Sequence, residues 1–202
     1  YEHYLEPMLK SLRNPSVNIT EDLIKLYQRG EVQRVESEAR ELLGKYPDSE
    51  VVHNVLGASL QSQGKFEAAV EAYDQAIKSN PQFAEAYNNK GNALKESGKV
   101  SEALSSYKHA VELEPKFFIA YKNLGGALTE QNRLEDAIEA FDKALELKSG
   151  YLDAYVGRAH AKRQLKQFGE ALIDHEQIVR LKPEWIDGYI NYGDSLKNLG
   201  RL

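Results

Sequence analysis

The sequence repeats itself with a period of 34 residues, and no other feature constrains its fold as strongly. Glycines recur with this spacing at Gly57, Gly91 and Gly125. Aromatic residues recur with the same spacing at positions 73, 107 and 141. Self-similarity at a fixed period is the signature of a repeat architecture. The fold is therefore predicted from one unit and the way it meets its neighbours.

The unit of residues 84–117 predicts two helices. Tyr87, Gly91 and Leu94 fall at i, i+4 and i+7, which is one helical face. After a turn, a second stripe of the same kind begins at Ala103. Pro115 ends the second helix, because the residue before a proline is pushed out of the α region. The small side chains of Gly91 and Ala103 favour a close approach of two antiparallel helices, at roughly 8–10 Å.

This pattern resembles the tetratricopeptide repeat family. The unit reads aromatic-x2-[L/K]-G-x2-L, then Ala-x3-aromatic, and closes with proline, and it holds register over most of the chain. The resemblance implies an all-α, right-handed superhelical solenoid of about 11–12 antiparallel helices. In such a solenoid each unit contacts mainly its neighbours.

The sequence divides into a short leading segment and the array. Residues 1–15 do not fit the repeat and are predicted to form an amphipathic helix that caps the solenoid, rather than a binding element. Residues 16–202 form the predicted array, with repeats at 16–49, 50–83, 84–117, 118–151, 152–185 and a partial unit at 186–202.

The partial unit has a first helix without its partner. Tyr189, Tyr192, Leu196 and Leu202 are predicted to lie open there, and exposed apolar patches tend to find a partner. We therefore expect either that the natural chain continues past Leu202 or that another molecule covers this face. Self-association through the open half-repeat is one form of the second alternative.

Composition excludes several classes of function. A net charge of −5 disfavours a sequence-independent grip on nucleic-acid phosphates. The chain has no cysteine, which excludes disulfides and thiolate catalysis and leaves the redox compartment open. No apolar run approaches the roughly 20 residues that span a bilayer, and no signal peptide is visible. We predict no nucleic-acid partner, no membrane insertion and a cytoplasmic location for a chain that looks like a fragment, since its only methionine is Met8.

No constellation of residues predicts catalysis, a metal or a cofactor. None of the five histidines pairs with another at i+3 or i+4, so metal spacing is absent. His53 and His175 occupy positions that hold Tyr or Phe in other units, and we expect them to pack at the core edge. Arg158, Lys162 and Lys166 form a cationic stripe at i, i+4 and i+8. It is either an anion-binding patch or, as we expect, a set of long side chains with charged heads in water.

The family resemblance implies that the first helices line a concave binding face. The second, fifth, sixth, ninth, twelfth and thirteenth positions of each unit point inward in this family. The peptide- or protein-binding residues predicted in this way are Glu85, Asn88, Asn89, Asn92, Lys95, Lys122, Asn123, Thr129, Asp153, His160, Arg163, Asn191 and Asp194. An asparagine amide both donates and accepts, so it can pair with a peptide group. Asn89 and Asn123 are expected to face solvent in the empty groove.

The sequence thus predicts a non-enzymatic scaffold that binds an extended peptide or a partner protein in the groove. The carboxylate clamp of chaperone-tail binders is not in register, because Asp153 and Gly157 stand where cations are needed. Asn89, Asn123 and Asn191 fit the asparagine ladder of protein O-linked N-acetylglucosamine transferases. Similar arrays precede glycosyltransferase or sulfotransferase domains in many bacterial proteins. The alternative function is therefore a substrate-recognition arm of such a larger enzyme, whose catalytic domain would lie outside this chain. The sequence beyond the last residue would discriminate between the two.

Overall fold

The computed structural model describes residues 14–201, and all regular structure in that range is helical. Its eleven helices are α2 (Val17–Gln28), α3 (Val32–Lys45), α4 (Glu50–Ser62), α5 (Phe66–Ser79), α6 (Ala84–Glu96), α7 (Val100–Leu113), α8 (Phe118–Glu130), α9 (Leu134–Leu147), α10 (Leu152–Gln164), α11 (Phe168–Leu181) and α12 (Ile186–Asn198). The predicted all-α class and helix pairing are confirmed. The capping helix predicted within residues 1–15 falls almost entirely outside the described residues.

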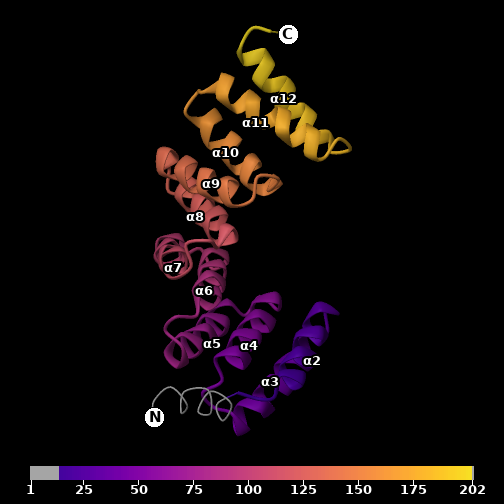
Figure 1. The fold of residues 1–202 in the computed structure, drawn as a ribbon, viewed down its shortest axis with the longest axis vertical. Coiled ribbons are helices and arrows are strands. Elements are labelled where there is room, and N and C mark those ends of the chain that lie inside the picture. Colours follow the sequence, from indigo (N-terminus) through magenta and orange to yellow (C-terminus); the bar gives the residue numbers. More distant parts are fainter. Residues whose placement is uncertain (1–13, 202) are drawn as a thin grey trace. The chain divides into compact units, whose positions relative to one another are not determined.

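The helices form two compact structural units, each of which spans several repeats of the sequence, and Figure 1 shows the order of the helices within each. These two structural units are called the first unit and the second unit. The first unit ends at Leu113 and contains α2 to α7. The second begins at Glu114 and contains α8 to α12. Within each unit every helix contacts the next one in sequence, α2 and α6 both touch α4, and α8 touches α10. A hydrogen bond between Arg163 and Asn191 links α10 to α12. The even-numbered helices, which are the first helices of the predicted repeats, therefore stand side by side in each unit.

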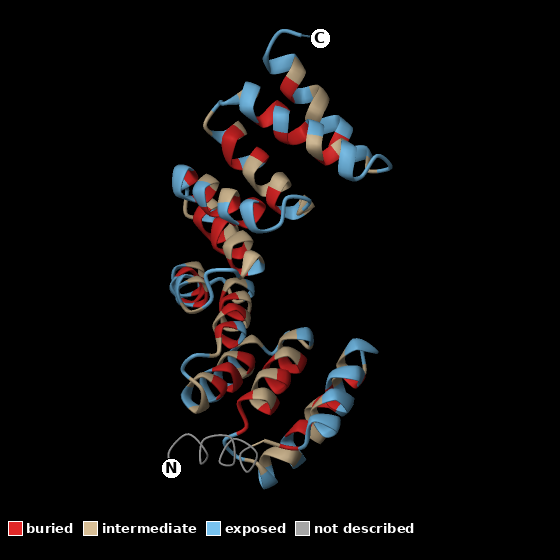
Figure 2. Cartoon of the chain, viewed as in Figure 1, coloured by how far each residue is buried: buried red, intermediate tan, exposed pale blue. Residues whose placement is uncertain are grey.

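Each regular helix pair packs an aromatic ring into a notch left by glycine. A Cβ atom added to Gly57 would lie 2.6 Å from the ring of Tyr73, and one added to Gly91 would lie 2.6 Å from the ring of Tyr107. Both rings are almost completely buried. Figure 2 shows the buried positions recurring along the helices of each unit. The recurring glycine and aromatic positions of the sequence are therefore two halves of one contact.

The turn between paired helices keeps one backbone shape even where its residue changes. Gly64 and Gly98 adopt φ angles of +74° and +83°, in the left-handed region that glycine enters without strain. The equivalent residues of the next two repeats are Asn132, with a φ of +57°, and Lys166, with a φ of +60°. Lysine is unusual there, because a left-handed conformation brings its Cβ against the following carbonyl.

The last helix, α12, packs against α11. Tyr189 is 49% exposed, as the partial unit predicts, and Ile190 is 57% exposed. Tyr192 and Leu196 are half-buried, whereas Ile186, which was not among the residues predicted to lie open, is 73% exposed. Leu202 lies outside the described residues. Self-association through this face stays a prediction.

Candidate functional site

In the first unit, the faces of α2, α4 and α6 enclose a hollow of about 330 Å³. It is lined by Tyr27, Ala58, Gln61, Ser62, Tyr73, Asn89, Asn92 and Glu96. Most of these side chains carry an amide, hydroxyl or carboxylate, and the hollow is open to solvent. It can therefore receive groups that form hydrogen bonds.

Hydrogen bonds hold the walls of this hollow in place. The hydroxyl of Tyr73 donates to Gln61 Oε1 at 3.0 Å, and Gln61 Nε2 donates to Glu96 Oε1 at 3.0 Å. Burial raises the pKa of Tyr73, so its phenol remains a neutral donor. Asn89 Nδ2 donates to Asn54 Oδ1 across neighbouring first helices at 3.1 Å. The amide groups are thus fixed before any ligand arrives.

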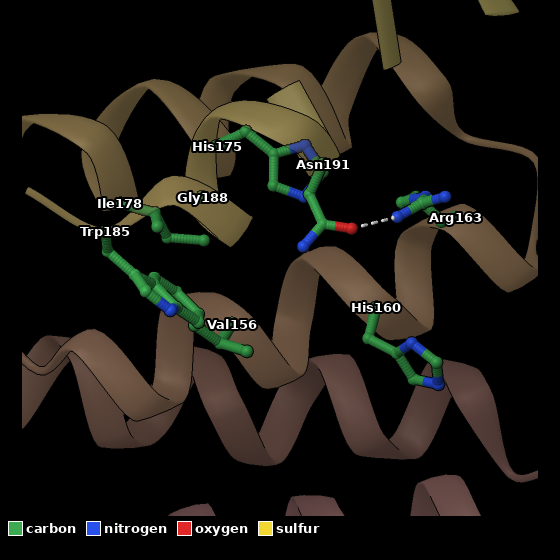
Figure 3. A pocket seen from close by; sticks show the side chains of 8 residues that line it. All are labelled: Val156, His160, Arg163, His175, Ile178, Trp185, Gly188 and Asn191. Atoms are coloured by element: carbon green, nitrogen blue, oxygen red, sulfur yellow. Dashed lines mark hydrogen bonds between the residues drawn. The ribbon is translucent and has the colours of Figure 1, made fainter. Parts of the chain in front are cut away.

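In the second unit, a smaller hollow of about 80 Å³ lies between α10, α11 and α12. Figure 3 shows its lining, with the Arg163 guanidinium directed at the amide of Asn191. Arg163 Nη1 donates to Asn191 Oδ1 at 2.8 Å, and its Nη2 lies 3.6 Å from Asp194 Oδ2. The arrangement brings together three of the predicted binding residues and ties α10 to α12.

A larger hollow of about 470 Å³ in the same unit is lined by residues of α8, α9 and α10 and by two residues that follow α11. Lys122 and Asp153, both predicted as binding residues, lie at its edge. Phe141 and Trp185 give it an aromatic lining. Its chemistry differs from that of the first-unit hollow, although both are built from first-helix faces.

The structure changes the status of several predicted binding residues. Asn88 and Asn123 are buried, at 4% and 9% exposure, so the expectation that Asn123 faces solvent is wrong. Asn89 is half-buried. Thr129 turns its hydroxyl to the carbonyl of Gly125, at 2.9 Å. Buried amides of this kind stabilise the packing of first helices as much as they offer a surface to a ligand.

The remaining predicted residues lie at or near the surface of the first helices. Glu85 and His160 are exposed, and Lys95 is half-buried. His160 lines the small hollow and contacts Gln164 at 2.6 Å. Glu85 and Lys95 line none of the three hollows described. A binding role for these residues stays a prediction.

The cationic stripe of α10 is not a solvated face at Arg158 and Lys162. Lys162 is 9% exposed, and its Nζ donates to Asp174 Oδ2 at 3.0 Å. Arg158 donates to both carboxylate oxygens of the fully buried Asp174 and to Asp142. The expectation that these charged heads lie in water is wrong, because a partner on α11 takes them into the interior. Lys166 does lie exposed.

Sequence reasoning missed functional candidates that the repeat register already contained. Gln61 and Ser62 occupy the twelfth and thirteenth positions of the repeat at residues 50–83. Tyr27 occupies the twelfth position of the repeat at 16–49. Applying the inward-facing positions to those two repeats would have found all three. Trp185 had no such signal, because it lies in the loop after α11.

The described residues, 14–201, contain no group of three His, Cys, Asp or Glu side chains placed to hold a metal ion. Within the same range, every helix is too short or too polar to cross a membrane. His175 is buried, as its position in the repeat predicts, and His53 is half-buried.

Comparison with known proteins agrees with the helix-pair geometry. Residues 57–98 match a family model described as TPR repeat, and residues 88–151 match one described as tetratricopeptide repeat. A comparison with curated protein sequences finds no match. The family matches span residues 57–151, and the paired helices agree with them, so this part of the chain resembles the tetratricopeptide-repeat family, whose fold is typically non-catalytic.

Solved structures extend the likeness to most of the chain. PilF of Pseudomonas aeruginosa superposes with a TM-score of 0.82 at 20% identity, covering 91% of this chain and 84% of that one. MamA superposes with a TM-score of 0.69 at 26% identity, covering 72% of this chain and 85% of its own. YrrB, described as a TPR protein with an unusual peptide-binding site, gives a TM-score of 0.70 at 15% identity, with coverages of 96% and 97%.

Proposed function

We propose that this chain is a non-enzymatic interaction scaffold that binds an extended segment of a partner protein on the first-helix faces of its units. The observation that supports this most directly is the row of fixed amide groups in the first unit. Asn54 and Asn89 pair with each other from neighbouring first helices at 3.1 Å. Asn89 Oδ1 also accepts from Asn88 Nδ2 at 3.3 Å. An amide has two donor hydrogens and two acceptor lone pairs, so these bonds use only part of the capacity of Asn54 and Asn89.

The rest of the first-unit hollow suits an extended peptide. Gln61 and Glu96 carry further polar atoms within the same hollow as Asn89. Backbone amides and carbonyls of an extended chain need partners wherever they leave water. The likeness to YrrB, a protein described as having a peptide-binding site, agrees with this proposal.

The transferase-arm alternative draws less support from the structure. Its asparagine ladder would need Asn123, which is buried at 9% exposure, and Asn191, which already accepts from Arg163. Gly157 interrupts the ladder between them. This alternative and the cytoplasmic location stay predictions.

The test begins with selection of a displayed random peptide library on the whole chain. A recovered peptide is then titrated into ¹⁵N-labelled protein. We expect amide shifts to concentrate on α4 and α6 and to spare the outer face of α5. Shifts confined to second helices, or a library that yields no binder, would overturn the proposal.

Paired substitutions sharpen this test. Asn54→Ala combined with Asn89→Ala removes both amides of this pair; because it also removes the acceptor of the buried Asn88, a melting curve must show that the fold is kept. A neutral hydrogen bond contributes about 0.5–1.5 kcal/mol, so affinity should fall about 2- to 12-fold per amide. Gln75→Ala removes an exposed amide from α5 and is the matched control, with unchanged affinity expected.

A further inference from the structure

The large hollow of the second unit differs from its first-unit counterpart in the side chains that form it. The two hollows occupy equivalent places in the repeat: Ala58, Tyr73 and Asn89 line one, and Gly126, Phe141 and Gly157 line the other at the same three positions. A methyl group, a phenol and an amide are thus replaced by two hydrogens and a plain phenyl ring.

The two glycines shape this hollow in different ways. A Cβ atom added to Gly126 would meet no heavy atom within 4 Å, so this side of α8 opens directly into the hollow. A Cβ atom added to Gly157 would collide with the ring of Phe141. The ring therefore lies against the bare backbone of α10, where every other repeat except the first carries Asn or Val.

The lining around this space is apolar and aromatic. Leu152 and Val156 of α10 add aliphatic surface, and Trp185 adds the indole ring. The volume of about 470 Å³ falls within the roughly 300–1,000 Å³ range of small-ligand sites. Burial of a large apolar side chain there is favoured at roughly 25 cal/mol per Å² of apolar surface removed from water.

The charged residues at the edge of the hollow indicate which kind of ligand residue would lie next to the buried apolar side chain. Lys122 comes from α8, and Lys182 follows α11 with its ammonium 5.9 Å from the centre of the Trp185 ring. Asp153 is the one carboxylate among the lining residues. Two cations against one anion favour an acidic neighbour on the ligand.

We infer that this hollow is a specificity pocket for a large apolar side chain, aromatic or leucine-like, flanked by a carboxylate in the bound peptide. The inference rests on the proposed function, because it names the peptide chemistry that the second unit selects. The pocket supplies shape and apolar surface, and the two lysines supply the preference for an acidic flank.

The only tryptophan of the chain, Trp185, lines this pocket and also the small hollow, so its emission reports occupancy of either one, and the Gly126→Gln variant assigns the signal to this pocket. The probe is a short Gly/Ser peptide with a central Glu-Phe-Glu, titrated into the whole chain. The comparison peptides carry Glu-Ser-Glu or Lys-Phe-Lys in its place. We expect saturable emission changes with Glu-Phe-Glu and at least tenfold weaker binding of the other two.

Gly126→Gln fills the pocket without a steric cost to the helix, since the added Cβ meets nothing. It should weaken Glu-Phe-Glu binding at least tenfold and leave the melting temperature equal or higher. Gly193→Gln is the matched control, because Gly193 is also inside a helix with nothing near an added Cβ. Lys182→Gln should reduce the discrimination between Glu-Phe-Glu and Lys-Phe-Lys while Glu-Ser-Glu stays weak.

The outcomes separate this inference from the proposed function. Equal binding of the three peptides, or binding that Gly126→Gln leaves unchanged, overturns the pocket while first-unit shifts with a library peptide still support a scaffold. Absence of any library binder overturns the scaffold instead. Glu-Phe-Glu titration of the first-unit variant Asn54→Ala with Asn89→Ala should match that of the natural chain.

Discussion

The repeat at residues 84–117 and the repeat at 152–185 share a register but not a core. Four core positions hold Gly91, Leu94, Ser106 and Tyr107 in the first and Ala159, Lys162, Asp174 and His175 in the second. Each set is buried. Where the earlier repeat has Leu94 and the small Ser106, the later repeat has Lys162 and Asp174, which form an ion pair. The comparison teaches that the repeat conserves positions in space, and that side chains change there in compensating pairs.

The two cores also direct their hydrogen bonds differently. Tyr107 donates its hydroxyl to Asn92 of its own first helix at 2.8 Å. His175 Nδ1 lies 3.0 Å from the hydroxyl of Ser195, which belongs to the following helix, α12. This hydrogen bond of Tyr107 therefore lies within its own helix pair, whereas that of His175 reaches forward to α12.

The contact between α11 and α12 also differs from its counterparts in the sizes of its side chains. Ile178 stands where the repeats between residues 50 and 151 have Ala76, Ala110 and Ala144. Gly188 stands where the repeats between residues 50 and 185 have Val52, Ala86, Ala120 and Ala154. A Cβ atom added to Gly188 would lie 3.3 Å from Ile178 Cγ2. The larger side chain on α11 thus takes the space that the smaller one on α12 leaves.

The largest effect is expected from Asp174→Ala. The substitution leaves Lys162 buried without its carboxylate and removes one of the two carboxylates that Arg158 contacts. Breaking a buried pair by removing one partner costs about 3–5 kcal/mol. Chemical denaturation should show a loss of this size.

The control restores the regular core. Combining Asp174→Ala with Lys162→Leu supplies the leucine and small residue that other repeats have at these positions. Replacement of a buried ion pair by apolar residues is often neutral or stabilising. Recovery of most of the lost stability is therefore expected. A double variant as unstable as the single one would mean that the two cores are not interchangeable.

A smaller loss is expected from Gly91→Ala. The new methyl would lie 2.6 Å from the Tyr107 ring, and overpacking of a core costs about 1–3 kcal/mol. The repeat at 152–185 already holds Ala159 at this position, opposite the smaller imidazole. Gly91→Ala combined with Tyr107→His should therefore lose less than the sum of the two single changes. Strict additivity in denaturant melts would contradict the pairing of these positions.

The sequence predicted what depends on the repeat register and failed where a side chain found an unexpected partner. Helix pairing and the burial of Tyr107 and His175 follow from periodic small and large residues. The burial of Lys162 did not follow, because it depends on Asp174 on another helix. Position alone likewise placed Asn123 at the solvent face of the groove, whereas this side chain is only 9% exposed.

Lys166→Gly tests the turn that the two repeats share. Lys166 has a φ of +60°, and Gly98 holds the equivalent place with a φ of +83°. The left-handed conformation costs a residue with a side chain roughly 1–2 kcal/mol, and the greater chain entropy of glycine offsets about 0.5–1 kcal/mol of the gain. We expect a net stabilisation of up to about 1 kcal/mol. Gly98→Lys should lose a similar amount, and a stabilised Gly98→Lys would refute the equivalence of the turns.

The smallest effect is a pH dependence near neutrality that arises from His175 in the later repeat. Burial lowers the pKa of His175, and Arg163 lowers it further, while Asp174 and Asp194 oppose the shift. The folded chain then binds this proton less readily than the unfolded chain, whose histidine pKa is about 6.5. The stability contributed by neutral His175 is present above that pH and is lost as the pH falls below it.

His175→Gln isolates this contribution, because glutamine keeps a polar partner for Ser195 and does not titrate. The free energy of unfolding is measured at about pH 8 and at about pH 5.5. Its decrease between the two should be larger for the natural chain than for the variant, since only the natural chain takes up a proton at residue 175 when it unfolds. Tyr107→Phe, which alters the equivalent position of the earlier repeat, should leave the pH dependence unchanged. If natural chain and His175→Gln lose stability in parallel, the proton is not taken up at His175.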